Sequence, residues 1–441
     1  MSPLVGLILF IVFFAAMIVF SSKLKINIGI LGILFAFILA GWFGGVSPST
    51  IVGYFPLSTI ASLFCASLFF CYIVQTGVFT GIVERILYFT HGRTGAIAFA
   101  LFLCSAVLAA IGGAEAAPLI MSPIAFAFVT YAGMNPLAAL ISCYFGTGFA
   151  GICFWASGGS AFRSLAEAVI GESASYTFSF ETLLFLAVFY IICMVASYFL
   201  LKSYKMDPEK VKLYTSNKPE PFSSEQKRAL GVLCVVIFFI VVPVVFQTLI
   251  YPNPVTEWLS QHLALKQACI LGVIAFHILG IGDSKDIFKN HIPWGSFVSI
   301  GGCCMIVQCA NALGIVDLLS NALTDAVPAF LIPAVIVALS ALLSFASNAF
   351  AIIPLFAPMA PALAAATGLH EATICACILS GCVATGLSPI SMGGSLWQIG
   401  ASEEQREAIF TKQWLAAAIT MIVMILISII GAWNVVDGIF Y

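Results

Sequence analysis

Long runs of apolar residues recur through the chain, and they limit its fold more than any other feature. A bilayer span needs about 20 such residues. Eight uninterrupted runs occur, at 3–21, 26–44, 57–77, 181–201, 229–250, 266–281, 294–313 and 412–436. Composition agrees, because 62% of the 441 residues are apolar and 8% are charged, whereas soluble proteins carry roughly a quarter charged residues. We therefore expect an all-α polytopic membrane protein, not a water-soluble or nucleic-acid-binding one.

Four further apolar stretches carry interruptions. Those at 135–170 and 371–400 are broken by Ser157-Gly-Gly-Ser160 and by Ser388-Pro-Ile-Ser-Met-Gly-Gly-Ser395. We interpret each as one crossing built from two half-helices, a broken helix. The stretches at 94–132 and 327–366 each have an apolar arm, a small-residue break, a proline and a second arm. They predict re-entrant hairpins, which return to the side of the membrane that they left.

This count gives five net crossings in residues 1–201 and five in residues 229–441, so the second half begins on the opposite side from the first. Between them, 202–228 is charged and predicts a cytoplasmic linker. Lysine and arginine concentrate in cytoplasmic loops. With the N-terminus outside, 15 of the 17 basic residues fall inside; Arg163 and Lys266 are the exceptions. The sequence thus predicts two inverted halves in a bacterial inner membrane.

The two halves also echo each other, as expected of the inverted repeats found in many secondary transporters. Pro56-Leu-Ser-Thr59 corresponds to Pro293-Trp-Gly-Ser296, displaced by 237 positions. Ser157-Gly-Gly-Ser160 corresponds to Met392-Gly-Gly-Ser395, displaced by 235. Such a slow drift is what a duplication with small deletions leaves.

The four breaks predict the binding site. Each is followed by a helix whose N-terminus lies near the membrane midplane and offers unpaired N–H groups and the positive end of the helix dipole to an anion. Pro118 and Pro354 suit the first turns of these helices. The substrate-binding residues that we assign are small or of capping type: Gly113, Ser157, Gly158, Gly159, Ser160, Ser347, Asn348, Ser388, Pro389, Ser391, Gly393, Gly394 and Ser395. The competing interpretation is proline and glycine kinks repaired by neighbouring helices.

A coupling cation is predicted at the same place. Glu115 is the acidic residue that we place at membrane depth, where such groups are rare and usually functional; it binds a proton or a cation, or else reaches solvent at an open hairpin tip. Freed carbonyls are oxygen ligands that suit sodium. The cation-coupling residues are Gly112, Glu115, Asn348 and Thr385, and the sodium ligands are Asn348, Ala349, Ser388 and Glu115.

Other polar residues have plainer expectations. Arg163 anchors the outer end of a half-helix, with a fork onto a carboxylate as the alternative. His277, Gln308 and Asn311 join helices, with ligand binding as the alternative. The fourteen cysteines lie mostly in apolar runs and pack as small apolar residues. No phosphate-binding loop or zinc-protease motif occurs, so we expect no enzyme and no cofactor other than sodium or protons.

At this point the chain resembles the ion transporter superfamily, in particular divalent anion:sodium symporters and malonate-carrier-like permeases. Ser347-Asn348-Ala349 and the segment Ser388–Ser395 are similar to the motifs with which that family holds sodium and substrate carboxylates. The resemblance implies a homodimer, a scaffold domain, and a transport domain that moves as an elevator. The first half departs from the pattern, since Gly112-Gly-Ala-Glu115 stands where a Ser-Asn motif is expected.

These features predict a secondary active transporter for a small carboxylate, such as a C3 or C4 dicarboxylate, coupled to sodium or protons. Two alternatives stay open at this stage. One is the large membrane subunit of a tripartite carboxylate transporter, and the other is a sodium/proton antiporter.

Overall fold

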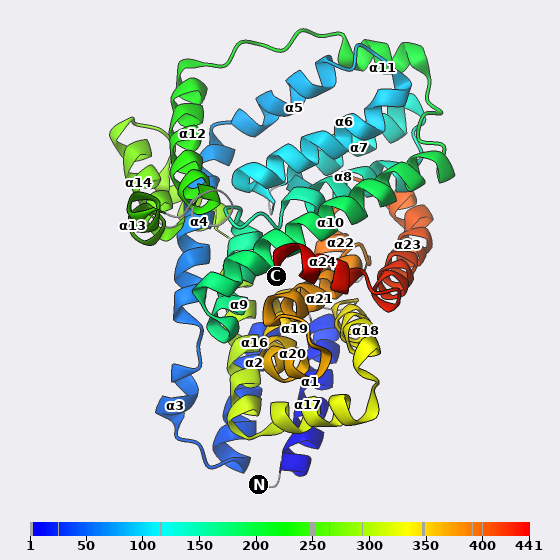
Figure 1. Cartoon of the computed structure of the whole chain (residues 1–441). Coiled ribbons are helices and arrows are strands. Elements are labelled where there is room, and N and C mark those ends of the chain that lie inside the picture. The colour runs from blue at the N-terminus through cyan, green and yellow to red at the C-terminus, as the bar shows by residue number, and fades with distance from the viewer. Residues whose placement is uncertain are drawn as a thin grey trace.

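The computed structural model describes residues 3–24, 26–114, 117–246, 253–263, 265–292, 294–345, 349–389, 391–398 and 400–441. Every regular element in these residues is helical, as the sequence predicts (Figure 1). Five helices are long and apolar enough to cross a membrane, or up to seven if each of two bent pairs is one span. The protein is therefore an all-helical, multi-pass membrane protein.

Residues before the linker form ten α-helices and two π-helical segments. They are α1 (Pro3–Leu24), α2 (Ile28–Ala36), η1 (Phe37–Phe43), α3 (Pro48–Gly53), α4 (Leu57–Gln75), α5 (Val78–Tyr88), α6 (Thr94–Leu108), η2 (Ala109–Gly113), α7 (Ala117–Ala132), α8 (Pro136–Ala150), α9 (Ser157–Ile170) and α10 (Glu172–Leu200). Asn135 caps α8 by accepting from the backbone N–H of Leu137. The predicted hairpin is thus α6, η2 and α7, and the predicted broken helix is α8 and α9.

Residues after the linker begin with α12 (Ser224–Val245), α13 (Pro254–His262), α14 (Leu265–Ile278), α15 (Ser284–Asp286), η4 (Ile287–His291), α16 (Trp294–Ala312) and α17 (Ile315–Ala326). The rest are η5 (Ala329–Leu331), α18 (Ile332–Ser344), α19 (Ala349–Phe356), η6 (Ala357–Met359), α20 (Ala360–Thr367), α21 (Glu371–Ala384), α22 (Met392–Leu396), α23 (Glu403–Ile429) and α24 (Ala432–Phe440). Pro354 lies in the interior of α19, so its predicted first-turn position is wrong. Pro118 is the second described residue of α7.

Two sharp bends occur at equivalent places. The pair α4 and α5 is bent by 62°, and the pair α16 and α17 by 75°. Gly77 and Gly314, 237 positions apart, sit at these bends with φ of 73° and 71°. A left-handed backbone stops an α-helix, and glycine adopts it without steric cost.

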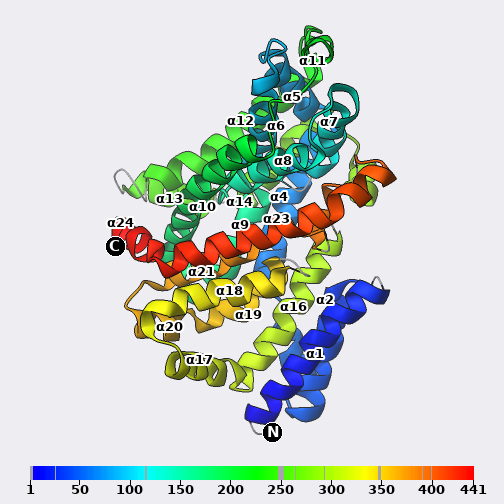
Figure 2. The same ribbon diagram turned by 90° about the vertical axis from the view of Figure 1, so that its right-hand side faces the viewer.

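Close packing between early and late helices forms one part of the core. A Cβ atom on Gly29 of α2 would lie 1.8 Å from the Val298 carbonyl oxygen of α16, and one on Gly302 of α16 would lie 1.8 Å from the Gly29 carbonyl oxygen. Small residues let membrane helices approach this closely. A second close contact lies between α4 and α14, where the ring of Phe69 packs against Gly272. Figure 2 shows α1 beside α2 and α16.

The linker is docked rather than fully solvated. It contains α11 (Pro208–Thr215), and the backbone N–H of Asp207 donates to the carbonyl of Ala132 at the end of α7 (2.9 Å). Further on, the Arg85 side chain of α5 donates to the Glu220 carbonyl (2.5 Å) and lies 3.6 Å from the centre of the Phe222 ring. The linker, α5 and α7 together line a cavity of about 1150 Å³.

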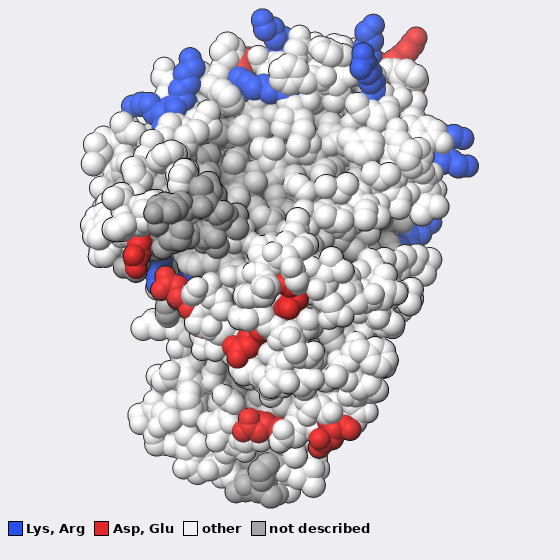
Figure 3. All heavy atoms as spheres, viewed as in Figure 1, with Lys and Arg blue, Asp and Glu red and all other residues white. Residues whose placement is uncertain are grey.

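The hairpins of the two halves, and the short helices α5 and α17 that precede them, lie toward opposite ends of the molecule. In both views α5, α6 and α7 lie toward the end occupied by α11, whereas α17, α18 and α20 lie toward the other end, where the N-terminus is (Figures 1 and 2). Most Lys and Arg side chains on the face shown in Figure 3 gather toward the α11 end.

Candidate functional site

The first break separates α8 from α9 at residues 151–156. Here Gly159 is pressed against the chain, since a Cβ on it would lie 2.1 Å from the Cys153 carbonyl oxygen and 2.4 Å from that of Ile152. A Cβ on Gly158 would meet the Gly151 carbonyl oxygen at 3.3 Å. The glycine pair lets the first turn of α9 settle directly on the loop that precedes it.

The second break, residues 385–391 between α21 and α22, repeats this geometry. A Cβ on Gly394 would lie 2.0 Å from the Ser388 carbonyl oxygen and 2.6 Å from that of Leu387. A Cβ on Gly393 would meet the Gly386 carbonyl oxygen at 3.3 Å. Every one of these contacts is displaced by 235 positions from its counterpart in the first break.

Two side chains hold the second break from inside. Ser391 caps α22, since its hydroxyl oxygen accepts from the Gly394 N–H (3.0 Å) while the hydroxyl donates to the Ser388 carbonyl (2.8 Å). Gln413 of α23 is fully buried and donates to the carbonyls of Leu387 (2.8 Å) and Gly394 (3.0 Å). Its own amide oxygen accepts from Gln398 (2.6 Å). The carbonyls of Leu387, Ser388 and Gly394 are thus paired by protein donors.

Carbonyls in the last turn of α21 are paired in the same way. Each receives a side-chain hydroxyl from another helix: Val383 from Tyr144 (2.7 Å) and Tyr190 (3.2 Å), Ala384 from Thr420 (2.7 Å), and Cys382 from Ser344 (2.9 Å). Thr385 in turn donates to the Ala341 carbonyl of α18 (2.9 Å). These bonds tie the break to α8, α10, α18 and α23.

The first break is built differently. Its neighbours form a small apolar cluster of Ala106, Ala109, Ala150, Cys153 and Ala156, with Trp155 packed against it. The indole N–H of Trp155 donates to the Ala110 carbonyl of η2 (2.5 Å), which joins this break to the first hairpin. Thr147, one turn earlier in α8, has a buried hydroxyl with no hydrogen-bond partner among the described residues.

Each hairpin also contacts the segment that follows the break of the other half. The Ser122 hydroxyl of α7 donates to the Trp397 carbonyl just after α22 (2.7 Å) and accepts from the Gly400 N–H (2.9 Å). From the second hairpin, Phe350 of α19 stacks on Phe162 of α9 in the first half, with ring centres 4.6 Å apart. The two hairpins and two broken helices therefore form one connected body.

The structure places many of the predicted site residues at these breaks. Backbone positions at or beside the breaks are described for Gly112, Gly113, Ser157, Gly158, Gly159, Ser160, Ala349, Thr385, Ser388, Pro389, Ser391, Gly393, Gly394 and Ser395. Glu115, Ser347 and Asn348 lie outside the described residues. The hydroxyl hydrogens of Thr385 and Ser391 are used by carbonyls of the chain.

Other polar expectations can be compared with the structure. Arg163 pairs with Glu167 (2.8 Å), donates to Ser175 (3.1 Å) and lies 4.4 Å from the centre of the Tyr176 ring. It thus fastens α9 to the start of α10. His277 joins α14 to α4 through the Tyr72 hydroxyl (2.8 Å), as expected of a residue that links helices.

Sequence reasoning missed Gln413 and placed too few acids in the membrane. Glu181 is fully buried, nine residues into the span α10, so Glu115 is not the one acidic residue to consider there. The apolar run begins at residue 181, but the helix begins at Glu172. Two polar turns at the start of α10 hid the position of Glu181.

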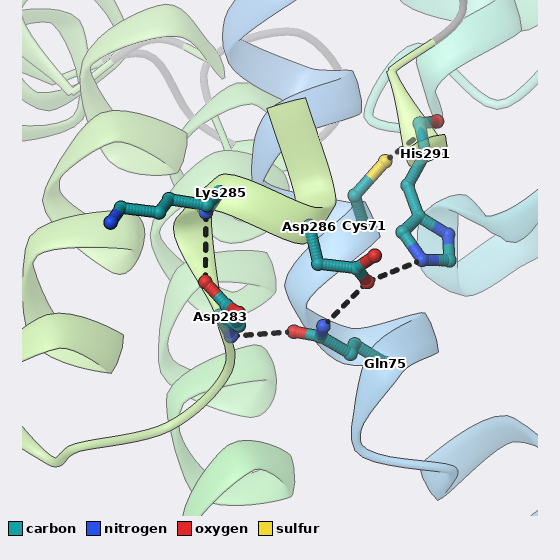
Figure 4. A network of polar contacts seen from close by, with 6 residues as sticks. All are labelled: Cys71, Gln75, Asp283, Lys285, Asp286 and His291. Carbon is teal, nitrogen blue, oxygen red and sulfur yellow. Dashed lines mark hydrogen bonds and ion pairs between the residues drawn. The ribbon is translucent and has the colours of Figure 1, made fainter. Parts of the chain in front are cut away.

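A second polar network lies away from the breaks (Figure 4). The Gln75 side chain, at the end of α4, donates to Asp286 (3.0 Å) and accepts from the Asp283 N–H (2.8 Å). His291 pairs with the same Asp286 oxygen (3.0 Å). The network fixes the connection between α14 and α16 onto α4, which makes it an anchor for that loop.

Several apolar spans, together with the hairpins and broken helices between them, define a polytopic membrane protein. The sequence model of the CitMHS family, described as a citrate transporter, matches residues 8–380. The chain belongs to this citrate transporter family, which is part of the ion transporter superfamily. The resemblance to that superfamily is thereby confirmed. No curated protein matches the chain significantly.

Proposed function

We propose that this protein is a secondary active transporter that moves citrate or a smaller dicarboxylate across the membrane together with sodium or protons. Membership of the citrate transporter family supports an anionic carboxylate as substrate. Citrate takes precedence over the C3 and C4 dicarboxylates expected from the sequence, because the family description names it.

The observation that carries the proposal is the repeated geometry of the two breaks. Gly158-Gly159 and Gly393-Gly394 press on the preceding carbonyls at matching distances, displaced by 235 positions. The bends at Gly77 and Gly314 match as well. These pairs support two repeats, 1–201 and 229–441, and the opposite placement of their hairpins supports an inverted relation between them (Figure 1).

The inverted arrangement brings a half-helix from each side toward the middle of the membrane. The N-terminus of α9 supplies backbone N–H groups and a positive dipole end for one carboxylate. Ser347, Asn348, Ala349 and Ser388 complete the site from the second half, and Glu115 binds the coupling cation from the first. The basic side chains near α11 support a cytoplasmic location of that end, with the N-terminus outside (Figure 3).

Helix packing supports a division of the chain into a scaffold and a transport body. The scaffold comprises α1, α2, α4, α12, α14 and α16, which pack on one another. The transport body comprises α6 to α10 and α18 to α24, which share the network around the breaks. In our proposal the transport body moves past the scaffold as an elevator, in a homodimer of the bacterial inner membrane.

Uptake by the purified chain in proteoliposomes tests the proposal. We expect saturable uptake of radiolabelled citrate driven by an inward sodium or proton gradient, with C3 and C4 dicarboxylates as competitors. Uptake that needs added binding protein would make the chain the large subunit of a tripartite system. Sodium/proton exchange that ignores carboxylates would make it an antiporter.

Site variants then test the residues. Asn348→Ala and Ser391→Ala should abolish coupled uptake while membrane insertion is kept, and Glu115→Gln should change its pH or sodium dependence. Lys412→Ala, on the exposed face of α23, is the matched control. Normal uptake by both Asn348→Ala and Ser391→Ala would show that the site lies elsewhere.

A further inference from the structure

A buried carboxyl group outside the proposed substrate site has no bonding partner among the described residues. Glu181 is 0% exposed, and neither of its oxygens accepts or donates a hydrogen bond within the described part of the chain. It also takes part in none of the ion pairs formed there. An ionised carboxylate in such a place loses its hydration without compensation.

A second carboxyl group lies beside it. Asp437 of α24 acts on Glu181 electrostatically, and Thr373 of α21 lies next to Glu181 as well. The Thr373 hydroxyl, however, donates to Asp437 (2.7 Å), which also accepts from the His370 N–H (2.8 Å). Asp437 therefore accepts from two donors, and because the single hydroxyl proton of Thr373 goes to Asp437, no donor is left for Glu181 among the described residues.

The groups that face Glu181 add no positive charge. From α21 they are the buried thiols of Cys375 and Cys377, and from α24 and the residue after it they are Asp437 and Tyr441. The other titratable groups beside α10 have partners away from Glu181. On α8, Tyr144 lies against Tyr190 and Cys143 lies toward Ser105; on α9, Arg163 pairs with Glu167 and lies over Tyr176. The His370 ring, before α21, stacks on Tyr441. A negative charge on Glu181 would face another negative charge.

Helix α24 packs on α10 and α21 beside Glu181. The Trp433 ring packs at a tilt against Phe185, one turn from Glu181, with ring centres 4.1 Å apart. The Tyr441 ring stacks on His370 at 3.8 Å. Asp437 makes the polar contact between these two ring pairs, so α24 is fastened by three side chains over Glu181.

We propose that Glu181 and Asp437 form a proton-binding site, in which one proton occupies a Glu181 oxygen and keeps α24 docked on α10 and α21. When the proton leaves to water, a carboxylate remains with no donor, and α24 must shift to admit water. The site is separate from the proposed transport site and does not depend on which substrate is carried.

The same helix pair connects this site to the second break. Along α10, Tyr190 follows Glu181 by nine residues, and along α21, Val383 follows Thr373 by ten. Tyr190 donates to the Val383 carbonyl, so the helices run parallel and touch at both places, about 14 Å apart. Proton loss at Glu181 therefore loosens one end of a contact whose other end supports the break.

Infrared spectroscopy of the purified full-length protein, without substrate, tests the site directly. We expect a C=O stretching band of a protonated carboxylic acid at neutral pH in the wild type and in Glu172→Gln, an exposed control on the same helix. The band should be missing from Glu181→Gln. A band of equal strength in Glu181→Gln would overturn the assignment, whatever the outcome of the transport assay.

Two further measurements cover the pair and the choice of ion. Asp437→Asn keeps an oxygen acceptor for His370 and Thr373 but removes the neighbouring charge, so the band should disappear at lower pH than in the wild type. An unchanged midpoint would overturn the pairing. When sodium chloride replaces choline chloride at constant pH, the band should stay in place. Loss of the band would show a sodium site instead of a proton site.

Discussion

The two breaks have the same backbone and different surroundings. Gly159 and Gly394 meet the preceding carbonyls at 2.1 and 2.0 Å from a Cβ position. Yet the second break is held by Ser391, Gln413 and a set of hydroxyl donors, whereas alanines and Trp155 surround the first. Glycine thus sets the shape of a broken helix, and the neighbouring helices decide how firmly it is held.

A substitution that fills the glycine contacts should have the largest effect, and it tests the shared part of the comparison. In Gly394→Ala and Gly159→Ala the new Cβ collides with backbone, and side-chain rotation cannot relieve this. We expect a loss of about 3 kcal/mol in unfolding free energy and loss of uptake in both, measured by thermal unfolding and proteoliposome assays. Gly393→Ala and Gly158→Ala, with contacts of 3.3 Å, are the controls and should fold. Tolerance of Gly159→Ala alone would show that the breaks are not equivalent.

Gln413→Leu tests the part that differs. The change leaves the buried carbonyls of Leu387 and Gly394 without their side-chain donor, which should cost about 2–4 kcal/mol. Denaturation of the detergent-solubilised protein measures it, with Lys412→Ala as the exposed neighbour. A loss below about 0.5 kcal/mol, typical of surface changes, would mean that these bonds do not hold the break.

Trp155→Phe probes the first break. It keeps most of the apolar contact and removes the N–H that reaches the Ala110 carbonyl. We expect about 1–2 kcal/mol of destabilisation, less than for Gln413→Leu because one donor is lost instead of two. If Trp155→Phe costs more than Gln413→Leu, the first break is the more firmly held, and the comparison reverses.

Tyr144→Phe should have the smallest effect. The Val383 carbonyl keeps the Tyr190 hydroxyl when Tyr144 is changed, so we expect about 0.5–1 kcal/mol. Because the two hydroxyls share one acceptor, Tyr144→Phe with Tyr190→Phe should cost more than the sum of the single changes. A double-mutant cycle measures this coupling, and strict additivity would show that the acceptor is not shared.

The sequence predicts where the backbone of the two breaks departs from a helix, but it does not predict which side chains hold the breaks in place. Glycine-serine segments such as Ser157–Ser160 mark the breaks because they interrupt an apolar run and recur 235 positions later in the second half. The donors are different, since Gln413 acts on Leu387 from a separate helix, and local pattern cannot reveal which helices meet.

Hydropathy alone also did not locate the ends of the helices. An apolar run shows where apolar residues begin, but α10 begins nine residues before Glu181 because its first turns are stabilised by packing on α9. Hydropathy also misplaced Pro354, since five described residues of α19 precede the proline.

The docked linker acts as a tether of fixed length. It is attached to α7 through Asp207 and to α5 through Arg85. Between the attachment at Asp207 and the clamp at Glu220 lie α11, which is about 12 Å long, and five residue steps after Thr215, which reach at most roughly 18 Å when fully extended. Any motion that separates these two attachment points by more than about 30 Å must first release the linker at one of them.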